Sequence, residues 1–207
     1  MSAPESKENS ARWPFGLGTI DEVPARRLTT PPDADPQQAA TVACRARNQN
    51  NGKSGIAAKR FIVDRKVADE FEGLFVAAVK ALKVGDPTDP ATNVGPLARA
   101  DLVDDLADQV GRTLAMGGRV LTGGKRQSGT GYYFEPTVLG DITRDMPVFR
   151  EETFGPVAAL IRVDGEEEAV AVANDCDYGP CAAAWTGAPE RGQARAGQLA
   201  AGIASPN

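Results

Sequence analysis

Four side chains of this sequence are considered first as nucleophiles: three thiols and one hydroxyl in a glycine-containing turn. The thiols belong to Cys44, Cys176 and Cys181, and the hydroxyl to Ser54 in residues 50–55. None of the 207 residues is a histidine. Ser-His-Asp triads, Cys-His pairs and histidine-ligated zinc sites are therefore excluded, because each needs an imidazole. Any catalysis by this sequence must use carboxylates, lysines, thiols or a cofactor.

The three cysteines do not form a disulfide pattern, because their number is odd and their spacing uneven. Reduced thiols of this kind are typical of a reducing compartment, and we expect a cytoplasmic protein. Cys176 and Cys181 flank an Asp-Tyr-Gly-Pro turn and could supply two metal ligands. A third and a fourth ligand are missing, so we predict no metal site.

Charge and hydropathy exclude two classes of partner. The 23 basic and 28 acidic residues give a net charge of -5 and are mixed along the chain, without the long blocks that bind nucleic acid. No apolar run approaches the roughly 20 residues of a membrane helix, and the N-terminus lacks the pattern of a secretory signal. We predict neither nucleic-acid nor membrane binding.

The spacing of apolar residues predicts alternating strands and helices after an irregular arm at residues 1–32, which has few large aliphatic residues. Asp35 caps the first helix, and Asp164 with Glu167 has the spacing of a capping box. The predicted helices cover residues 37–47, 67–82, 102–114, 166–174 and 189–201. The predicted strands cover residues 60–63, 119–122, 134–139, 157–163 and 181–186. Such alternation predicts a largely parallel, three-layer α/β domain, since parallel strands need crossover connections.

Six separated stretches carry a resemblance to a known family. They read PDAD, RNQNNGKSG followed by IAAKRFIV, ALKVGDPTDPATNVGPL, GGKRQSGTGYYFEPTVL, REETFGPVAAL and ANDCDYGPCAAAWT. In this order they resemble the catalytic domain of the aldehyde dehydrogenase superfamily, in particular the succinate-semialdehyde dehydrogenases. The resemblance implies a catalytic domain over residues 33–207. It also implies a relationship to NAD- or NADP-dependent enzymes that oxidise aldehydes to carboxylates.

The resemblance places the nucleophile at Gly55. In the family, the turn before the first of these strands reads Asn, any residue, Gly, Gln, any residue, Cys, and the cysteine attacks the aldehyde. Asn50 and Gly52 match this pattern, whereas Lys53 replaces the glutamine and Gly55 replaces the cysteine. Glycine has no side chain with which to form a thioester. Ser54 has no histidine base, so we expect no nucleophile at this position.

The resemblance also implies a second set of site residues. Glu152 would hydrogen-bond the nicotinamide ribose, and Phe154 would pack against the nicotinamide. Without a cofactor, we expect Arg150, Glu151 and Glu152 to form a solvated charge cluster and Phe154 to belong to the core. Lys53 is expected to be solvated, although it could attract an anion beside the empty position.

Parts of the family pattern are missing from this sequence. We find neither the Glu-Leu-Gly-Gly motif of the general base, nor the Rossmann-like cofactor domain, nor the C-terminal arm that pairs with a neighbouring subunit. We therefore expect a truncated, catalytically inert family member that binds no cofactor. Two alternatives remain open: an interaction module that associates with a full-length aldehyde dehydrogenase homologue, and an enzyme whose missing parts come from another chain.

Overall fold

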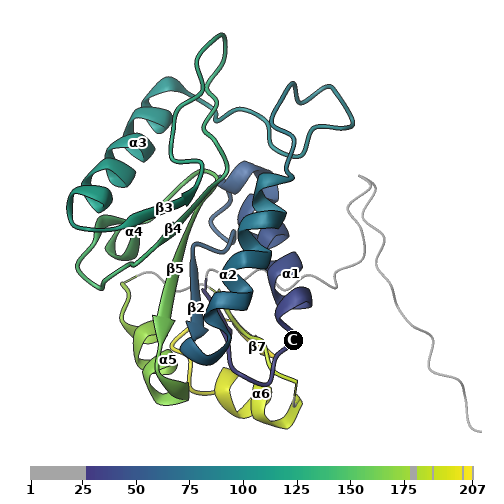
Figure 1. The fold of residues 1–207 in the computed structure, drawn as a ribbon, viewed down its shortest axis with the longest axis vertical. Coiled ribbons are helices and arrows are strands. Elements are labelled where there is room, and N and C mark those ends of the chain that lie inside the picture. Colours follow the sequence, from purple (N-terminus) through teal and green to yellow (C-terminus); the bar gives the residue numbers. More distant parts are fainter. Residues whose placement is uncertain (1–26, 178–180, 188, 202, 207) are drawn as a thin grey trace, which may run out of the picture.

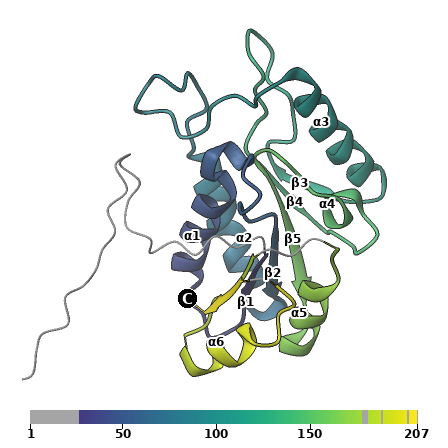
Figure 2. The same ribbon diagram turned by 180° about the vertical axis from the view of Figure 1, so that it is seen from behind.

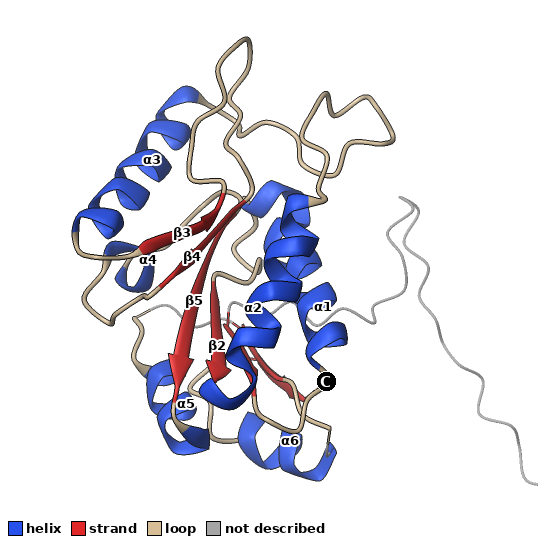
Figure 3. Ribbon diagram, in the orientation of Figure 1, coloured by secondary structure: helices blue, strands red, loops and turns tan. Residues whose placement is uncertain are grey.

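The fold is an α/β arrangement built on one sheet (Figures 1 and 3). The structure is a computed structural model and describes residues 27–177, 181–187, 189–201 and 203–206. The strands are β1 (Arg27–Thr30), β2 (Arg60–Asp64), β3 (Arg119–Thr122), β4 (Thr137–Gly140), β5 (Val157–Val163), β6 (Cys181–Ala184) and β7 (Ile203–Pro206). The helices are α1 (Pro36–Asn48), α2 (Arg65–Lys80), α3 (Ala100–Ala115), α4 (Pro147–Arg150), α5 (Gly165–Asn174) and α6 (Pro189–Ala196), with a 3-10 turn η1 (Gln49–Gly52).

The sheet contains seven strands in the order β3-β4-β5-β2-β1-β6-β7. Every neighbouring pair is parallel except β3 and β4, which are antiparallel. The predicted largely parallel sheet is therefore confirmed. The central strands β2 and β5 are almost completely buried, as expected of strands that are covered on both faces.

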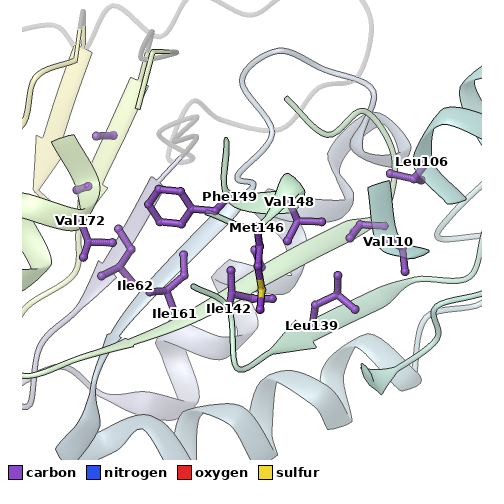
Figure 4. Close-up of a cluster of buried hydrophobic side chains, with 14 of the residues drawn as sticks. Ile62, Leu106, Val110, Leu139, Ile142, Met146, Val148, Phe149, Ile161 and Val172 are labelled. Carbon is purple, nitrogen blue, oxygen red and sulfur yellow. The ribbon is translucent and has the colours of Figure 1, made fainter. Parts of the chain in front are cut away.

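Hydrophobic clusters cover both faces of the sheet, which makes three layers. On β5, Ala158 and Leu160 point to the cluster under α1 and α2, which lie side by side in Figures 1 and 2. The alternate residues Ala159 and Ile161 point to the opposite cluster, under α3, α4 and α5. Figure 4 shows this second cluster. The alternation follows from the two-residue period of a strand.

The prediction of an irregular arm over residues 1–32 is wrong for its last part. Residues 27–30 form β1, which pairs with β2 on one side and with β6 on the other. Leu28 is the only large aliphatic residue of this strand. Hydrogen bonds from two neighbouring strands therefore hold β1 in place, and the local sequence carries little signal of them. Residues 1–26 lie outside the described part of the chain.

The predicted capping box at the start of α5 is also wrong in its residues. The Asp164 carboxylate accepts a hydrogen bond from Arg65 Nε at 3.0 Å instead of capping the helix. Glu168, one position after the predicted Glu167, accepts from the Asp164 backbone N–H at 2.6 Å. By contrast, the predicted cap of α1 is confirmed, since Asp35 Oδ1 accepts from the Gln37 N–H at 2.9 Å.

Most other predicted elements are confirmed with shifted ends. The strand predicted at residues 134–139 begins at Thr137, the strand at 181–186 ends at Ala184, and the helix at 189–201 ends at Ala196. The strand at residues 157–163 has the predicted bounds. Among the described residues, no helix is long and apolar enough to cross a membrane.

Candidate functional site

The turn that precedes β2 is held in a conformation that suits its Asn-Asn-Gly sequence. Asn50, Asn51 and Gly52 have φ angles of 49°, 56° and 70°, in the left-handed region where asparagine and glycine are the least strained residues. The Gly52 carbonyl oxygen accepts two hydrogen bonds, from Arg47 Nη2 at 2.7 Å and from the Gly155 N–H at 3.0 Å. The turn is therefore fastened to α1 and to the loop before β5.

Two side chains of this turn also bind a distant loop. Asn51 Oδ1 accepts from the Gly95 N–H at 2.7 Å, and Asn51 Nδ2 donates to the Pro96 carbonyl oxygen at 3.4 Å. Lys53 Nζ donates to the same oxygen at 3.2 Å. The expectation of a solvated Lys53 is therefore wrong, because the side chain is half-buried and hydrogen-bonded. The sequence analysis missed Asn51, whose partners lie more than 40 residues away.

Gly55 lies in the next turn and is half-buried. This turn is closed by the Ala57 N–H, which donates to the Ser54 carbonyl oxygen at 3.1 Å. Within the described part of the chain, Gly55 does not belong to the residues with a left-handed φ angle. A residue with a side chain can therefore take this backbone conformation, whereas the glycine present offers no functional group.

Lys59 joins this turn to the residues predicted at the cofactor side. Its Nζ donates to the Ser54 carbonyl oxygen at 3.4 Å and lies 3.6 Å from Glu152 Oε1. The same nitrogen lies 4.8 Å from the centroid of the Phe154 ring. The side chains of Lys59 and Glu152 are 7% and 19% exposed, so the ion pair is largely shielded from water. The structure thus brings Gly55, Glu152 and Phe154 to one place, around an ammonium that the sequence analysis did not single out.

The expected charge cluster is divided between different partners. Glu151 accepts hydrogen bonds from Arg112 Nη1 and Nη2 at 2.7 and 2.8 Å, and this arginine lowers the pKa of the Glu151 carboxyl. Arg150 Nη1 donates to Asp175 Oδ1 at 2.6 Å. Glu152, in contrast, faces Lys59. The expectation that Phe154 belongs to the core is wrong, because this residue is 39% exposed.

The cysteines do not supply a substitute thiol in the turn. Cys44 is buried in α1, and burial raises the pKa of its thiol to about 11 although Asn48 hydrogen-bonds the sulfur. Cys181 is buried in β6, and Cys176 is half-buried beside the cavity that Lys59 and Glu152 line. In the ranges that the structure describes, no group of three or more His, Cys, Asp or Glu residues could hold a metal ion.

Comparison with known proteins identifies the family of this chain. The model of the aldehyde dehydrogenase family matches residues 29–207. The chain is 50% identical over 155 residues to a succinate-semialdehyde dehydrogenase [NADP(+)] of Mycobacterium avium, covering 75% of this chain and 33% of that protein. It is 47% identical over 154 residues to a succinate semialdehyde dehydrogenase [NAD(P)+] of Escherichia coli, covering 74% and 33%. The chain spans about a third of the length of these relatives.

Solved structures show the same fold. A succinic semialdehyde dehydrogenase from Streptococcus pyogenes in complex with NADP+ matches with a TM-score of 0.83 and 33% identity, over 89% of this chain and 41% of that one. Lactaldehyde dehydrogenase from Escherichia coli matches with a TM-score of 0.84 and 31% identity, over 89% and 39%. This chain belongs to the aldehyde dehydrogenase family.

Proposed function

We propose that this chain keeps the aldehyde dehydrogenase fold but does not oxidise aldehydes as written. The observation that carries the proposal is Gly55, which stands in an ordered turn at the position where the resemblance puts the nucleophile. Acyl transfer through a covalent intermediate requires a thiolate or an activated hydroxyl at the reacting carbon. A hydrogen atom in place of the side chain removes this step, whatever aldehyde the relatives use.

The neighbours of Gly55 do not replace the missing thiol. The Ser54 hydroxyl oxygen accepts from the Ile56 N–H at 3.4 Å, and no histidine exists to take its proton. An unactivated serine hydroxyl is a weak nucleophile at neutral pH. Cys44 remains a neutral thiol because burial raises its pKa. These two observations support the assignment of an inert site.

The described residues also fit a dinucleotide poorly. The predicted ribose contact, Glu152, is already paired with Lys59. The cavity that these two side chains share with Cys176 measures about 20 Å³, which is room for about one water molecule. The exposed Phe154 ring could contact a nicotinamide but does not enclose one. We therefore assign no NAD or NADP to this chain alone, although the relatives are named for NADP+ or NAD(P)+.

The direct test is turnover. The purified chain, incubated with succinate semialdehyde and either NAD+ or NADP+, is expected to produce no NADH or NADPH above the blank. Gly55→Cys is expected to gain a thiol that p-nitrophenyl acetate acetylates once per chain, visible by mass spectrometry on the peptide that contains residue 55. Ser54→Cys is the matched control, since it moves the same thiol by one residue and is expected to react more slowly.

Two results would contradict this proposal. Turnover by the unmodified chain would show that another group carries the reaction. Equal acetylation of the Ser54→Cys and Gly55→Cys variants would show that position 55 has no special place in the turn. Circular dichroism of each variant establishes that the comparison is made on folded protein.

A second candidate function is association with an intact aldehyde dehydrogenase. The observation that favours it is the apolar surface at one edge of the sheet. Strand β3 is an edge strand that exposes Val120, and the neighbouring end of α3 exposes Leu114 and Met116. Within the described part of the chain, β3 is an edge strand, and exposed apolar side chains at and near such an edge favour contact with another chain.

Co-expression with a tagged full-length succinate-semialdehyde dehydrogenase tests this association. The expected result is co-purification of the two chains, which Val120→Lys abolishes by placing a charge on the exposed strand. Elution of this chain apart from the tagged enzyme, as a monomer or an aggregate, would rule the association out.

A further inference from the structure

The Lys59 ammonium contacts both the Gly55 turn and the loop of Glu152 and Phe154. Its Nζ lies 3.4 Å from the Ser54 carbonyl oxygen, 3.6 Å from Glu152 Oε1 and 4.8 Å from the centroid of the Phe154 ring. Its backbone is held as well, because the Lys59 carbonyl oxygen accepts from the Ala159 N–H of β5 at 3.0 Å. The side chain is 7% exposed. Lysine side chains are rarely buried unless they are paired. Lys59 is buried with its ammonium paired and its backbone carbonyl hydrogen-bonded, so both ends of the residue are held in place.

The ammonium lies close to the backbone from which a side chain at position 55 would extend. The Ser54 carbonyl oxygen and Gly55 Cα belong to the same planar peptide unit. Since Lys59 Nζ lies 3.4 Å from this oxygen, it lies within about 6 Å of Gly55 Cα. At such a distance, in a largely buried environment, a cation stabilises a thiolate relative to a thiol.

The geometry points to Lys59 as a positioning residue of this site. Its ammonium holds the position-55 turn against residues 152–154 and favours an anionic side chain at position 55. This inference rests on the proposed assignment of position 55 as the nucleophile position. It goes further in one respect: it predicts that the surroundings of Gly55 still favour ionisation of a thiol, although the thiol is absent.

Other charged groups near the site also affect the ionisation of a thiol at position 55: anions oppose it and cations favour it. Glu152 is the anion that faces Lys59, and it opposes a thiolate. Arg60 and Glu151 line the same cavity as Lys59, and Arg60 Nη1 donates to the Asp175 carbonyl oxygen. Lys53, in the turn itself, donates to the Pro96 carbonyl oxygen. Lys59 Nζ donates to the Ser54 carbonyl oxygen, beside position 55.

The test measures the ionisation of a cysteine placed at position 55. The pH dependence of iodoacetamide alkylation of Gly55→Cys, followed on the peptide that contains residue 55, gives the pKa of this thiol. We expect a pKa below the ordinary cysteine value of about 8.5. Adding Lys59→Met is expected to raise this pKa by about one unit and to lower the alkylation rate at pH 7 by about tenfold. Lys59→Arg is expected to restore most of the shift.

A matched lysine and an opposite charge serve as controls. Lys66→Met removes the same charge from an exposed position in the first turn of α2, beyond the far end of β2, and is expected to leave the thiol pKa unchanged. Glu152→Gln is expected to shift the pKa downward, because it removes the anion that faces Lys59. The thiol pKa of the Glu152→Gln variant tests the inference even if the Lys59→Met variant does not fold.

The inference is overturned by an unchanged thiol pKa in both the Lys59→Met and the Glu152→Gln variants of Gly55→Cys. It is equally overturned if Lys66→Met moves the pKa as far as Lys59→Met does. These outcomes differ from failure of the proposed function, which appears as aldehyde turnover by the chain that carries Gly55.

Discussion

Gly52→Ala is expected to lower the free energy of unfolding by about 2–4 kcal/mol. The Gly52 φ angle of 70° is left-handed, which costs an alanine roughly 1 kcal/mol. An added Cβ would also collide with the Gly155 carbonyl oxygen and would lie 2.6 Å from Arg47 Nη2. Relief of this collision must break a buried hydrogen bond of the Gly52 carbonyl, at a further cost of about 1–3 kcal/mol.

Urea unfolding followed by circular dichroism measures this effect, with Gly73→Ala as the matched control. Gly73 lies in the interior of α2, is exposed, and has open space where a Cβ would stand. Its replacement is expected to stabilise the chain by roughly 0.5–1 kcal/mol. If Gly52→Ala stays within about 0.5 kcal/mol of the parent, the turn is not held as the contacts of Gly52 indicate.

The position-55 site depends on the same contacts. Gly52 fastens the turn to the Gly155 N–H, three residues after Glu152. A displaced turn would move residue 55 away from Lys59 and Glu152. In the Gly55→Cys background, Gly52→Ala is therefore expected to slow acetylation of Cys at position 55, even under conditions where the protein remains folded.

The elements with strong periodicity could be predicted from the sequence. Phe71, Phe75 and Val79 repeat every four residues in α2 and are all buried, and β5 is apolar at every position except Arg162. Strand β1 could not be predicted, because its Arg-Leu-Thr-Thr sequence becomes a strand through pairing with β2 and β6. The capping residues of α5 differ because Asp164 finds an arginine partner on another element.

The site was predictable in its residues and not in its contacts. The resemblance singles out Gly55, Glu152 and Phe154, and the structure places them around one ammonium. Lys59 carries no local signal, since its partner Glu152 is 93 residues away in the sequence and belongs to another loop. The contact could not be predicted because its two residues are far apart in the sequence.

Arg47 is a case in which a signal was available. Ala39, Ala43 and Arg47 follow each other at intervals of four residues, which places them on one face of α1, and all three are buried. The spacing alone therefore indicates that this arginine points inward. The predicted helix ended at this residue, where an arginine is usually exposed and interacts favourably with the helix dipole.

Arg47→Met is expected to raise the free energy of unfolding at pH 7 by about 1–2 kcal/mol. Arg47 is 1% exposed, and its Nη2 donates to the Gly52 carbonyl oxygen. Its Nε and Nη1 atoms have no hydrogen-bond partner. Burial without a carboxylate lowers the pKa of the guanidinium to about 9. A methionine of similar length fills the same space without a charge, while the Gly155 N–H still binds the Gly52 carbonyl.

The dependence of this gain on pH separates the burial of charge from a change in packing. Because the pKa of Arg47 is lower in the folded chain than in the unfolded one, the unfolded chain binds more protons above about pH 8. As the pH rises above about 9, the buried guanidinium loses its charge in the folded parent, and the free energy of unfolding of the parent therefore increases. The advantage of Arg47→Met is expected to shrink between pH 8 and 10.5, as measured by urea unfolding of both proteins. An advantage that stays constant over this range would mean that better packing, and not relief of a buried charge, stabilises the variant.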